Sequence, residues 1–89
     1  MRRANILIQG QVQGVCYRAH AAEMGQRLHL HGYVRNVSNG DVRAIVEGDD
    51  EAVSAFVAWC YEGSPQAYVE EVRVTDEAYV GDLEPFAIR

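Results

Sequence analysis

The sequence predicts an α+β fold in which two helices cover one face of a mainly antiparallel sheet. Two observations predict this class. Short segments with the apolar patterns of strands alternate with two segments of helical spacing, and an Asn-Gly pair joins two of the strands directly. The order strand, helix, strand, strand, helix, strand, followed by a short C-terminal strand, is typical of a ferredoxin-like α/β sandwich. With 89 residues, residues 1–89 are expected to form a single domain.

Five segments carry strand patterns, namely residues 4–9, 33–37, 42–47, 67–75 and 85–88. Asn39-Gly40 lies between the second and third of them and predicts a tight hairpin, because a type I′ turn needs positive φ at both central positions. The apolar parity changes within residues 67–75, from Val69 to Val72 and Val74, which predicts a bulge or an uncertain start there. Residues 76–84 are predicted to be a polar loop, and Pro85 suits an edge strand.

Two segments carry helical spacing. The first covers residues 15–28, where Tyr17, Ala21, Met24 and Leu28 recur on one face. The second opens at residues 49–51, whose acidic side chains suit a helix N-terminus. Its apolar stripe consists of Val53, Phe56, Val57 and Cys60. Residues 63–65, Gly-Ser-Pro, are predicted to end it.

Charge is distributed unevenly along the chain. Residues 1–44 carry a balance of +4 and residues 45–89 a balance of −9, which gives the net charge of −5. An acidic chain is a poor general nucleic-acid binder, so no nucleic-acid partner is expected. No apolar run reaches membrane-spanning length and no signal-peptide core is present. We therefore expect a cytoplasmic protein with no membrane partner.

The cysteines and histidines match no metal or redox spacing. Cys16 and Cys60 are predicted to be packed thiols in a reducing compartment. A disulfide between them stays open, because both predicted helices lie on the same sheet face. His29 and His31 lie two apart, as on one face of a strand, without a third ligand nearby. They are interpreted as exposed residues, as is His20, and no metal is predicted.

One loop carries the chemistry. Residues 10–18 read Gly-Gln-Val-Gln-Gly-Val-Cys-Tyr-Arg, and they leave the first strand and open the first helix. Unpaired N–H groups and the helix dipole favour an anion at such a place. Gly10 and Gly14 allow positive φ, and Arg18 adds a fork of donors suited to two phosphate oxygens. These residues predict a small oxyanion pocket.

Residues 10–18 strongly resemble the first signature of the acylphosphatase family, and residues 32–42, Gly-Tyr-Val-Arg-Asn-Val-Ser-Asn-Gly-Asp-Val, resemble the second. The resemblance runs over nearly the whole chain and implies the same fold. It also implies hydrolysis of acyl phosphates to a carboxylate and inorganic phosphate, with Arg18 binding the phosphate and Asn36 orienting the attacking water. The implied phosphate cradle consists of the amides of Gln13, Gly14, Val15, Cys16, Tyr17 and Arg18. Cys16 stands where many members have glycine or another small residue, and Tyr17 where phenylalanine is common.

The implied chemistry fits the residues. A carboxylate leaves without an acid catalyst, and phosphoryl transfer depends mainly on positioning and charge stabilisation. Asn36 can hold a water but is too weak a base to deprotonate it, and Asp41 lies beyond the hairpin turn. The substrate's phosphate is therefore expected to accept the proton, and no metal or cofactor is needed. A nucleophilic role of Cys16 is not expected, since only Tyr17 separates it from Arg18.

Other functions remain open at this stage. The same fold could form a non-catalytic regulatory module that binds a small anion. An RNA-binding sheet is disfavoured, because Tyr33 is the one aromatic residue in the first three predicted strands. The chain also resembles a domain of a larger carbamoyl-transfer maturation protein, but its compact ends favour a free-standing enzyme. We expect a monomer that binds a small acyl phosphate and inorganic phosphate.

Overall fold

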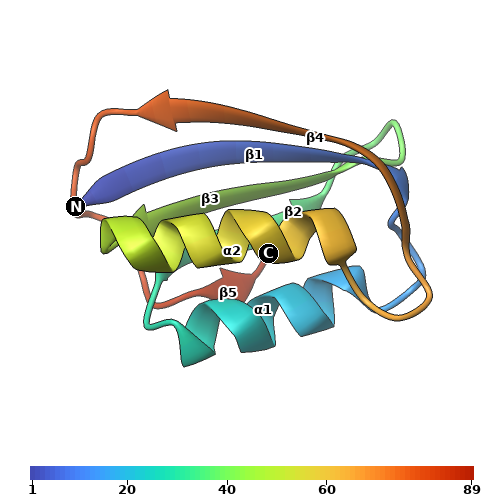
Figure 1. The fold of residues 1–89 in the computed structure, drawn as a ribbon, viewed down its shortest axis with the longest axis horizontal. Helices are drawn as coiled ribbons and strands as arrows, with labels where there is room; N and C mark the ends of the chain where they lie inside the picture. The colour runs from blue at the N-terminus through green and yellow to red at the C-terminus, as the bar shows by residue number, and fades with distance from the viewer.

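The computed structural model describes residues 1–89, which form five strands and two helices. Figure 1 shows the elements in chain order, and their bounds are β1 Arg2–Gln11, α1 Tyr17–Arg27, β2 His31–Asn36, β3 Val42–Gly48, α2 Asp50–Glu62, β4 Tyr68–Glu77 and β5 Ala87–Ile88. The sheet order is β4-β1-β3-β2-β5. Neighbouring strands are antiparallel except for β2 and β5, which run parallel. The predicted element order is confirmed.

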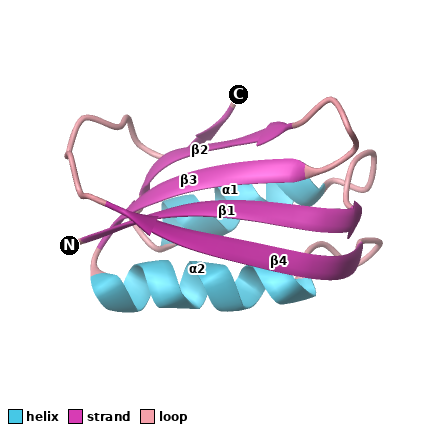
Figure 2. Cartoon of the chain, turned by 90° about the horizontal axis from the view of Figure 1, so that it is seen from above, coloured by secondary structure: helices cyan, strands magenta, loops and turns pink.

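The molecule has two layers. Both helices lie on one face of the sheet, and the opposite face, turned toward the viewer in Figure 2, is not covered by a helix. Alternating residues of the strands supply the sheet side of the core, among them Ile6 and Ile8, which are fully buried. The helices contribute Tyr17 and Phe56, and Phe86 closes the core before β5. The ferredoxin-like α+β sandwich is therefore confirmed.

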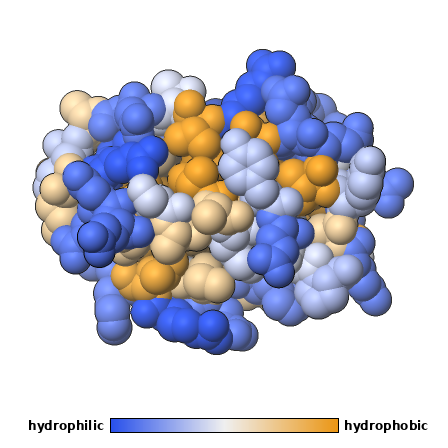
Figure 3. Space-filling model, in the orientation of Figure 1, coloured by the Kyte–Doolittle hydropathy of each residue, from blue (hydrophilic) through white to orange (hydrophobic).

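The side of the molecule seen in Figure 1, on which strands lie above the helices, has a mixed surface. Figure 3 shows apolar side chains near the middle of the face seen in Figure 1, with hydrophilic side chains around them. No helix of the structure is both long and apolar enough to span a membrane.

Several predicted boundaries are wrong by one to a few residues: β1 covers Arg2–Gln11 rather than residues 4–9, β2 covers His31–Asn36 rather than 33–37, and β5 covers Ala87–Ile88 rather than 85–88. The first helix begins at Tyr17 rather than at residue 15, because Cys16 adopts a left-handed conformation with φ 61° and ends the loop. It ends at Arg27, one residue before the predicted end. Strand β4 continues through Glu77, whereas residues 76 and 77 were expected in a loop. The acidic side chains do not interrupt the strand because Glu77 accepts a hydrogen bond from Arg3 of β1.

The change of apolar parity in β4 marks a bulge, which is one of the two alternatives that the sequence leaves open. Gln9 pairs with Glu71 and Gly10 pairs with Val69, so Glu70 is an extra residue in β4. Gly10 has φ 135°, and a Cβ there would lie 2.2 Å from the carbonyl oxygen of Tyr68. The close approach of the two backbones at the bulge requires glycine.

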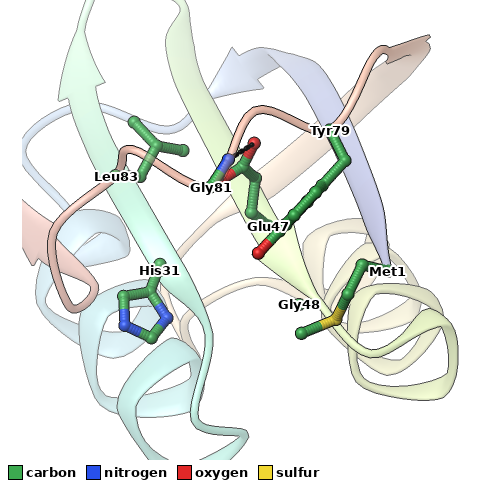
Figure 4. A pocket seen from close by; sticks show the side chains of 7 residues that line it. All are labelled: Met1, His31, Glu47, Gly48, Tyr79, Gly81 and Leu83. Atoms are coloured by element: carbon green, nitrogen blue, oxygen red, sulfur yellow. Dashed lines mark hydrogen bonds between the residues drawn. The ribbon is translucent and has the colours of Figure 1, made fainter.

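A buried carboxylate fastens the segment between β4 and β5 to the sheet. Glu47 of β3 is 2% exposed and accepts hydrogen bonds from Arg3 Nη1 at 3.1 Å and from the N–H groups of Val80 and Gly81 at 2.9 and 3.2 Å. Figure 4 shows the Gly81 N–H directed at this carboxylate, beside Tyr79, at a cavity of about 150 Å³. Burial disfavours the charged form, but the donors around it hold the pKa of Glu47 below its usual value.

Candidate active site

The loop between β1 and α1 turns through two left-handed residues. Gly14 has φ 75° and Cys16 has φ 61° with ψ 24°. Such values are strained for a residue with a Cβ, and Cys16 is one of only two non-glycine residues with positive φ in the chain. The predicted need for backbone freedom at Gly14 is confirmed, and the same need extends to Cys16.

The N–H groups of the loop have no acceptor within the protein. No main-chain N–H from Gln13 to Arg18 donates a hydrogen bond to another residue. Two of the loop carbonyls, by contrast, are engaged. The Val15 carbonyl accepts from the Ser64 hydroxyl at 2.7 Å, and the Cys16 carbonyl accepts from the His20 N–H at 3.1 Å. The loop therefore offers a set of free N–H donors, which suits an anion.

The Gln13 side chain holds the loop against the turn between β2 and β3. Its Nε2 donates to the carbonyl oxygens of Val37 and Asp41 at 2.7 and 2.8 Å. This side chain acts as a brace, which the sequence reasoning missed when it considered Gln13 for its main-chain amide. Since Val37 follows Asn36 directly, the brace fixes the loop relative to the end of β2.

Ser64 provides a second brace that the sequence reasoning missed. The serine was interpreted only as part of a helix stop, but it is 2% exposed and its hydroxyl donates to the loop. A signal was present in the sequence, because a small polar residue between Gly63 and Pro65 is common where a side chain bonds to a nearby backbone. The partner, 49 residues earlier, could not be read from it.

Arg18 and Asn36 share one surface hollow. It has a volume of about 320 Å³, and its lining consists of Val12, Gly14, Cys16, Tyr17, Arg18, Ala19, Asn36 and Ile88. Arg18 comes from the first turn of α1 and Asn36 from the last residue of β2. Four of the six predicted cradle residues line the hollow, whereas Gln13 and Val15 do not. Ile88 of β5, which the sequence reasoning did not place in the site, contributes an apolar wall.

The two polar side chains in the hollow are not engaged by the rest of the protein. Arg18 is half-buried and forms no ion pair, whereas Arg2, Arg3, Arg27 and Arg73 each do. The Asn36 Oδ1 atom is buried and accepts no hydrogen bond. Buried polar atoms nearly always have a partner, so the hollow contains one acceptor and one guanidinium whose hydrogen-bonding capacity the protein leaves unused.

Tyr17 and the cysteines have structural surroundings. Tyr17 is buried and its hydroxyl donates to the Cys60 carbonyl at 2.8 Å, and burial raises its pKa. Burial also raises the pKa of the Cys60 thiol to about 12, which makes it unreactive. Cys16 is exposed, so its predicted packing is wrong, because the left-handed turn directs it away from the core. Both thiols are free and no disulfide joins them.

No carboxylate or imidazole belongs to the hollow. Asp41 is mostly buried and accepts from the Asn39 side chain, so it supports the turn. His29 lies in a turn with φ 58°, while His31 opens β2, so the two do not share a strand face as the sequence suggested. No three His, Cys, Asp or Glu side chains are grouped in a way that could hold a metal ion.

The fold and the hollow define a ferredoxin-like protein that presents a donor-rich loop, an arginine and an amide at one end of its sheet. The acylphosphatase family model matches residues 4–88. The chain is 48% identical over 89 residues to an acylphosphatase from Anaeromyxobacter sp. (strain Fw109-5), covering 100% of this chain and 96% of that protein.

Solved structures agree with this match. The chain is similar to the crystal structure of acylphosphatase from Bacillus subtilis, with a TM-score of 0.96, 30% identity and coverage of 100% and 99%. It is also similar to an acylphosphatase from Coxiella burnetii, with a TM-score of 0.92, 32% identity and coverage of 99% and 92%. The chain belongs to the acylphosphatase family. Its function is that of a hydrolase acting on the acid anhydride bond of acyl phosphates.

Proposed function

We propose that Arg18 and the main-chain N–H groups from Gln13 to Arg18 hold the phosphoryl group of an acyl phosphate, while Asn36 positions the attacking water. The observation that carries this proposal is the juxtaposition of unpaired groups in one hollow: free N–H donors, a guanidinium without an acid, and a buried amide oxygen without a donor. A phosphate satisfies the first two and a water molecule the third.

The reaction proceeds by displacement at phosphorus. The water oxygen bonds to phosphorus as the bond from phosphorus to the carboxyl oxygen breaks, and the carboxylate leaves with the electron pair. Its low basicity removes the need for a general acid. The Asn36 Oδ1 accepts one water hydrogen bond and aims the water oxygen, and the water proton passes to an oxygen of the substrate phosphate. Arg18 and the N–H groups stabilise the charge that develops on the phosphoryl oxygens.

The braces around the loop give this arrangement its rigidity. The Ser64 hydroxyl donates to the Val15 carbonyl within the loop, and the Gln13 side chain donates to two carbonyls of the β2–β3 turn, so both leave the loop N–H groups free. Donors that are already oriented need no rearrangement when charge develops, which is the main source of electrostatic catalysis. The proposal includes no metal ion and no cofactor. We further propose that the enzyme is a monomer and acts in the cytoplasm. Neither nucleic acid nor a membrane is proposed as its partner.

Hydrolysis of benzoyl phosphate tests the assignments. Arg18→Ala should lower kcat/KM by about 10²–10³-fold and weaken competitive inhibition by inorganic phosphate, because the main cation of the cradle is lost. Arg27→Ala is the matched control, since Arg27 is an exposed arginine of the same helix that pairs with Glu23. Near-normal activity of the Arg18 variant would contradict the assignment.

Asn36→Ala separates water positioning from phosphate binding. It should reduce kcat by about 10²-fold or more while the inhibition constant of inorganic phosphate stays within a few-fold of the wild-type value. A parallel loss of both would mean that Asn36 binds phosphate instead. Activity that persists in the presence of a chelator is expected. A steep dependence of kcat on an enzyme group titrating near neutrality would contradict proton transfer to the substrate.

A further inference from the structure

Two arginines face each other on the side of the sheet that no helix covers. Arg35 of β2 and Arg43 of β3 are direct partners in the antiparallel register. Their chain neighbours Val34, Val42 and Ala44 are buried in the core on the helical side. Since successive side chains of a strand point to opposite faces, the two guanidinium groups lie on the uncovered face seen in Figure 2.

Neither arginine has an acidic partner. Arg35 and Arg43 form no hydrogen bond or ion pair with another side chain, although four of the eight arginines in this chain do. The Nε of Arg43 is buried and donates to nothing. Like charges directly opposite in a sheet are destabilising, and a buried donor without an acceptor adds to that penalty. The pair is therefore unfavourable for the isolated protein.

The carboxylates of this face make their hydrogen bonds to other groups, although the charge of Arg43 lies near enough to Glu77 to help lower the pKa of that carboxyl. These carboxylates are Glu47, bound by Arg3 and two N–H groups; Glu77, bound by Arg3 and Asn5; Glu71, bound by Arg73; and Asp41, bound by Asn39. A third cation lies one row away, where the Arg89 guanidinium sits 4.1 Å from the centre of the Tyr33 ring. Positive charge thus concentrates on the β2–β3 part of this face in a chain whose net charge is −5.

We propose that Arg35 and Arg43 form a second anion site, on the uncovered face of the sheet, for a dianionic phosphate group. Opposite residues of antiparallel strands have Cβ atoms about 5 Å apart, so both planar forks reach one tetrahedral anion. The Arg43 Nε–H donor, which lacks an acceptor, then gains one. Arg35 precedes Asn36 directly, but the alternation of β2 puts this site on the face opposite the catalytic hollow. A free phosphate and a phosphate monoester share this chemistry.

Arginine side-chain NMR on the whole chain tests the site. During titration with inorganic phosphate, the Nε–H signals of Arg35 and Arg43 should shift and saturate, with a dissociation constant on the order of 1 mM. Arg43→Gln should weaken binding at Arg35 about tenfold. Arg27→Gln removes the same charge from α1 and should leave the titration unchanged. The Arg18 signal reports the catalytic hollow separately, so failure of one site does not obscure the other.

A second titration with phosphoserine identifies the source of the phosphate. Tighter binding than that of inorganic phosphate assigns the site to monoesters, and weaker binding assigns it to free phosphate. Both outcomes support the site. Shifts that do not saturate, that chloride reproduces at equal ionic strength, or that Arg27→Gln weakens as much as Arg43→Gln would overturn it, since the pair would then respond only to bulk salt.

Discussion

Glu47→Gln should destabilise the protein by about 2–3 kcal/mol at neutral pH. The carboxylate accepts from Arg3 and from two N–H groups, and hydrogen bonds to a charged partner contribute roughly 1.5–3 kcal/mol each. Glutamine keeps the volume but only one acceptor oxygen, and its NH₂ group faces other donors. The loss stays below the roughly 3–5 kcal/mol typical of a broken buried pair, because Arg3 keeps its ion pair with Glu77.

Urea and thermal unfolding measure this loss. For a domain of this size the expected decrease in Tm is about 10–20 °C. Glu77→Gln is the matched control, because Glu77 binds the same arginine but its side chain is 37% exposed, and it should change stability by less than about 1 kcal/mol. A Glu47 variant within about 0.5 kcal/mol of wild type would refute the reasoning.

The same comparison has a pH dependence with a definite sign. The folded-state pKa of Glu47 is lowered, so its contribution is complete above the unfolded-state pKa of about 4.3. The contribution is lost as the pH falls through the folded-state pKa, where the carboxylate becomes protonated in both states. The stability difference between wild type and Glu47→Gln should therefore be constant from pH 7 to about 5 and shrink at lower pH. A difference that stays constant to pH 2 would show that packing, rather than charge, is responsible.

Three further substitutions have definite expected outcomes. Gln13→Ala should raise KM for benzoyl phosphate several-fold while Tm changes little, because the loop loses its brace to the β2–β3 turn; unchanged steady-state kinetics would contradict that role. Gly25→Ala should lower the free energy of unfolding, measured in urea, by about 1–3 kcal/mol, because the added Cβ would lie 2.5 Å from the Phe86 ring. An unchanged free energy of unfolding would mean that the ring moves aside. Cys16→Gly should raise the free energy of unfolding by up to about 1 kcal/mol, because glycine adopts the positive φ at this position without strain. A lower free energy of unfolding would show that the thiol contributes packing.

The fold could be predicted from local patterns because its elements are locally consistent. Alternation around Ile6 and Ile8 and the Asn39-Gly40 turn depend on residues close in sequence, and the structure confirms the strands they predict. The change of parity after Val69 allowed either a bulge or an uncertain strand start, and the register shows the bulge. The burial of Glu47 could not be predicted, since a glutamate at the end of an alternating strand is normally solvated. The two N–H groups that bind it lie 33 and 34 residues later, in a segment without a periodic pattern.

Some residues of the candidate site can likewise be predicted from local sequence motifs, whereas others cannot. Arg18 and Asn36 are predicted site residues because two motifs resemble the family's signatures, and both residues line one hollow of the structure. Ser64 and Ile88 were missed, because each reaches the site through packing between distant segments. Cys16 was assigned to the core, since free cysteines are usually buried. Its left-handed conformation depends on the whole path of the loop and leaves it exposed.

The loop shows how a small domain keeps donors unsatisfied without losing its shape. Every brace acts on a carbonyl or through a side chain: Ser64 binds the carbonyl of Val15, His20 binds that of Cys16, and Gln13 reaches out to the neighbouring turn. If one of these bonds had used a loop N–H group, that group could no longer donate to phosphate. Because the braces avoid them, the N–H groups are fixed in direction and remain available. The groups that hold the loop in place are therefore different from the N–H groups that bind the anion, and loss of a brace weakens binding through the orientation of the donors rather than by removing one.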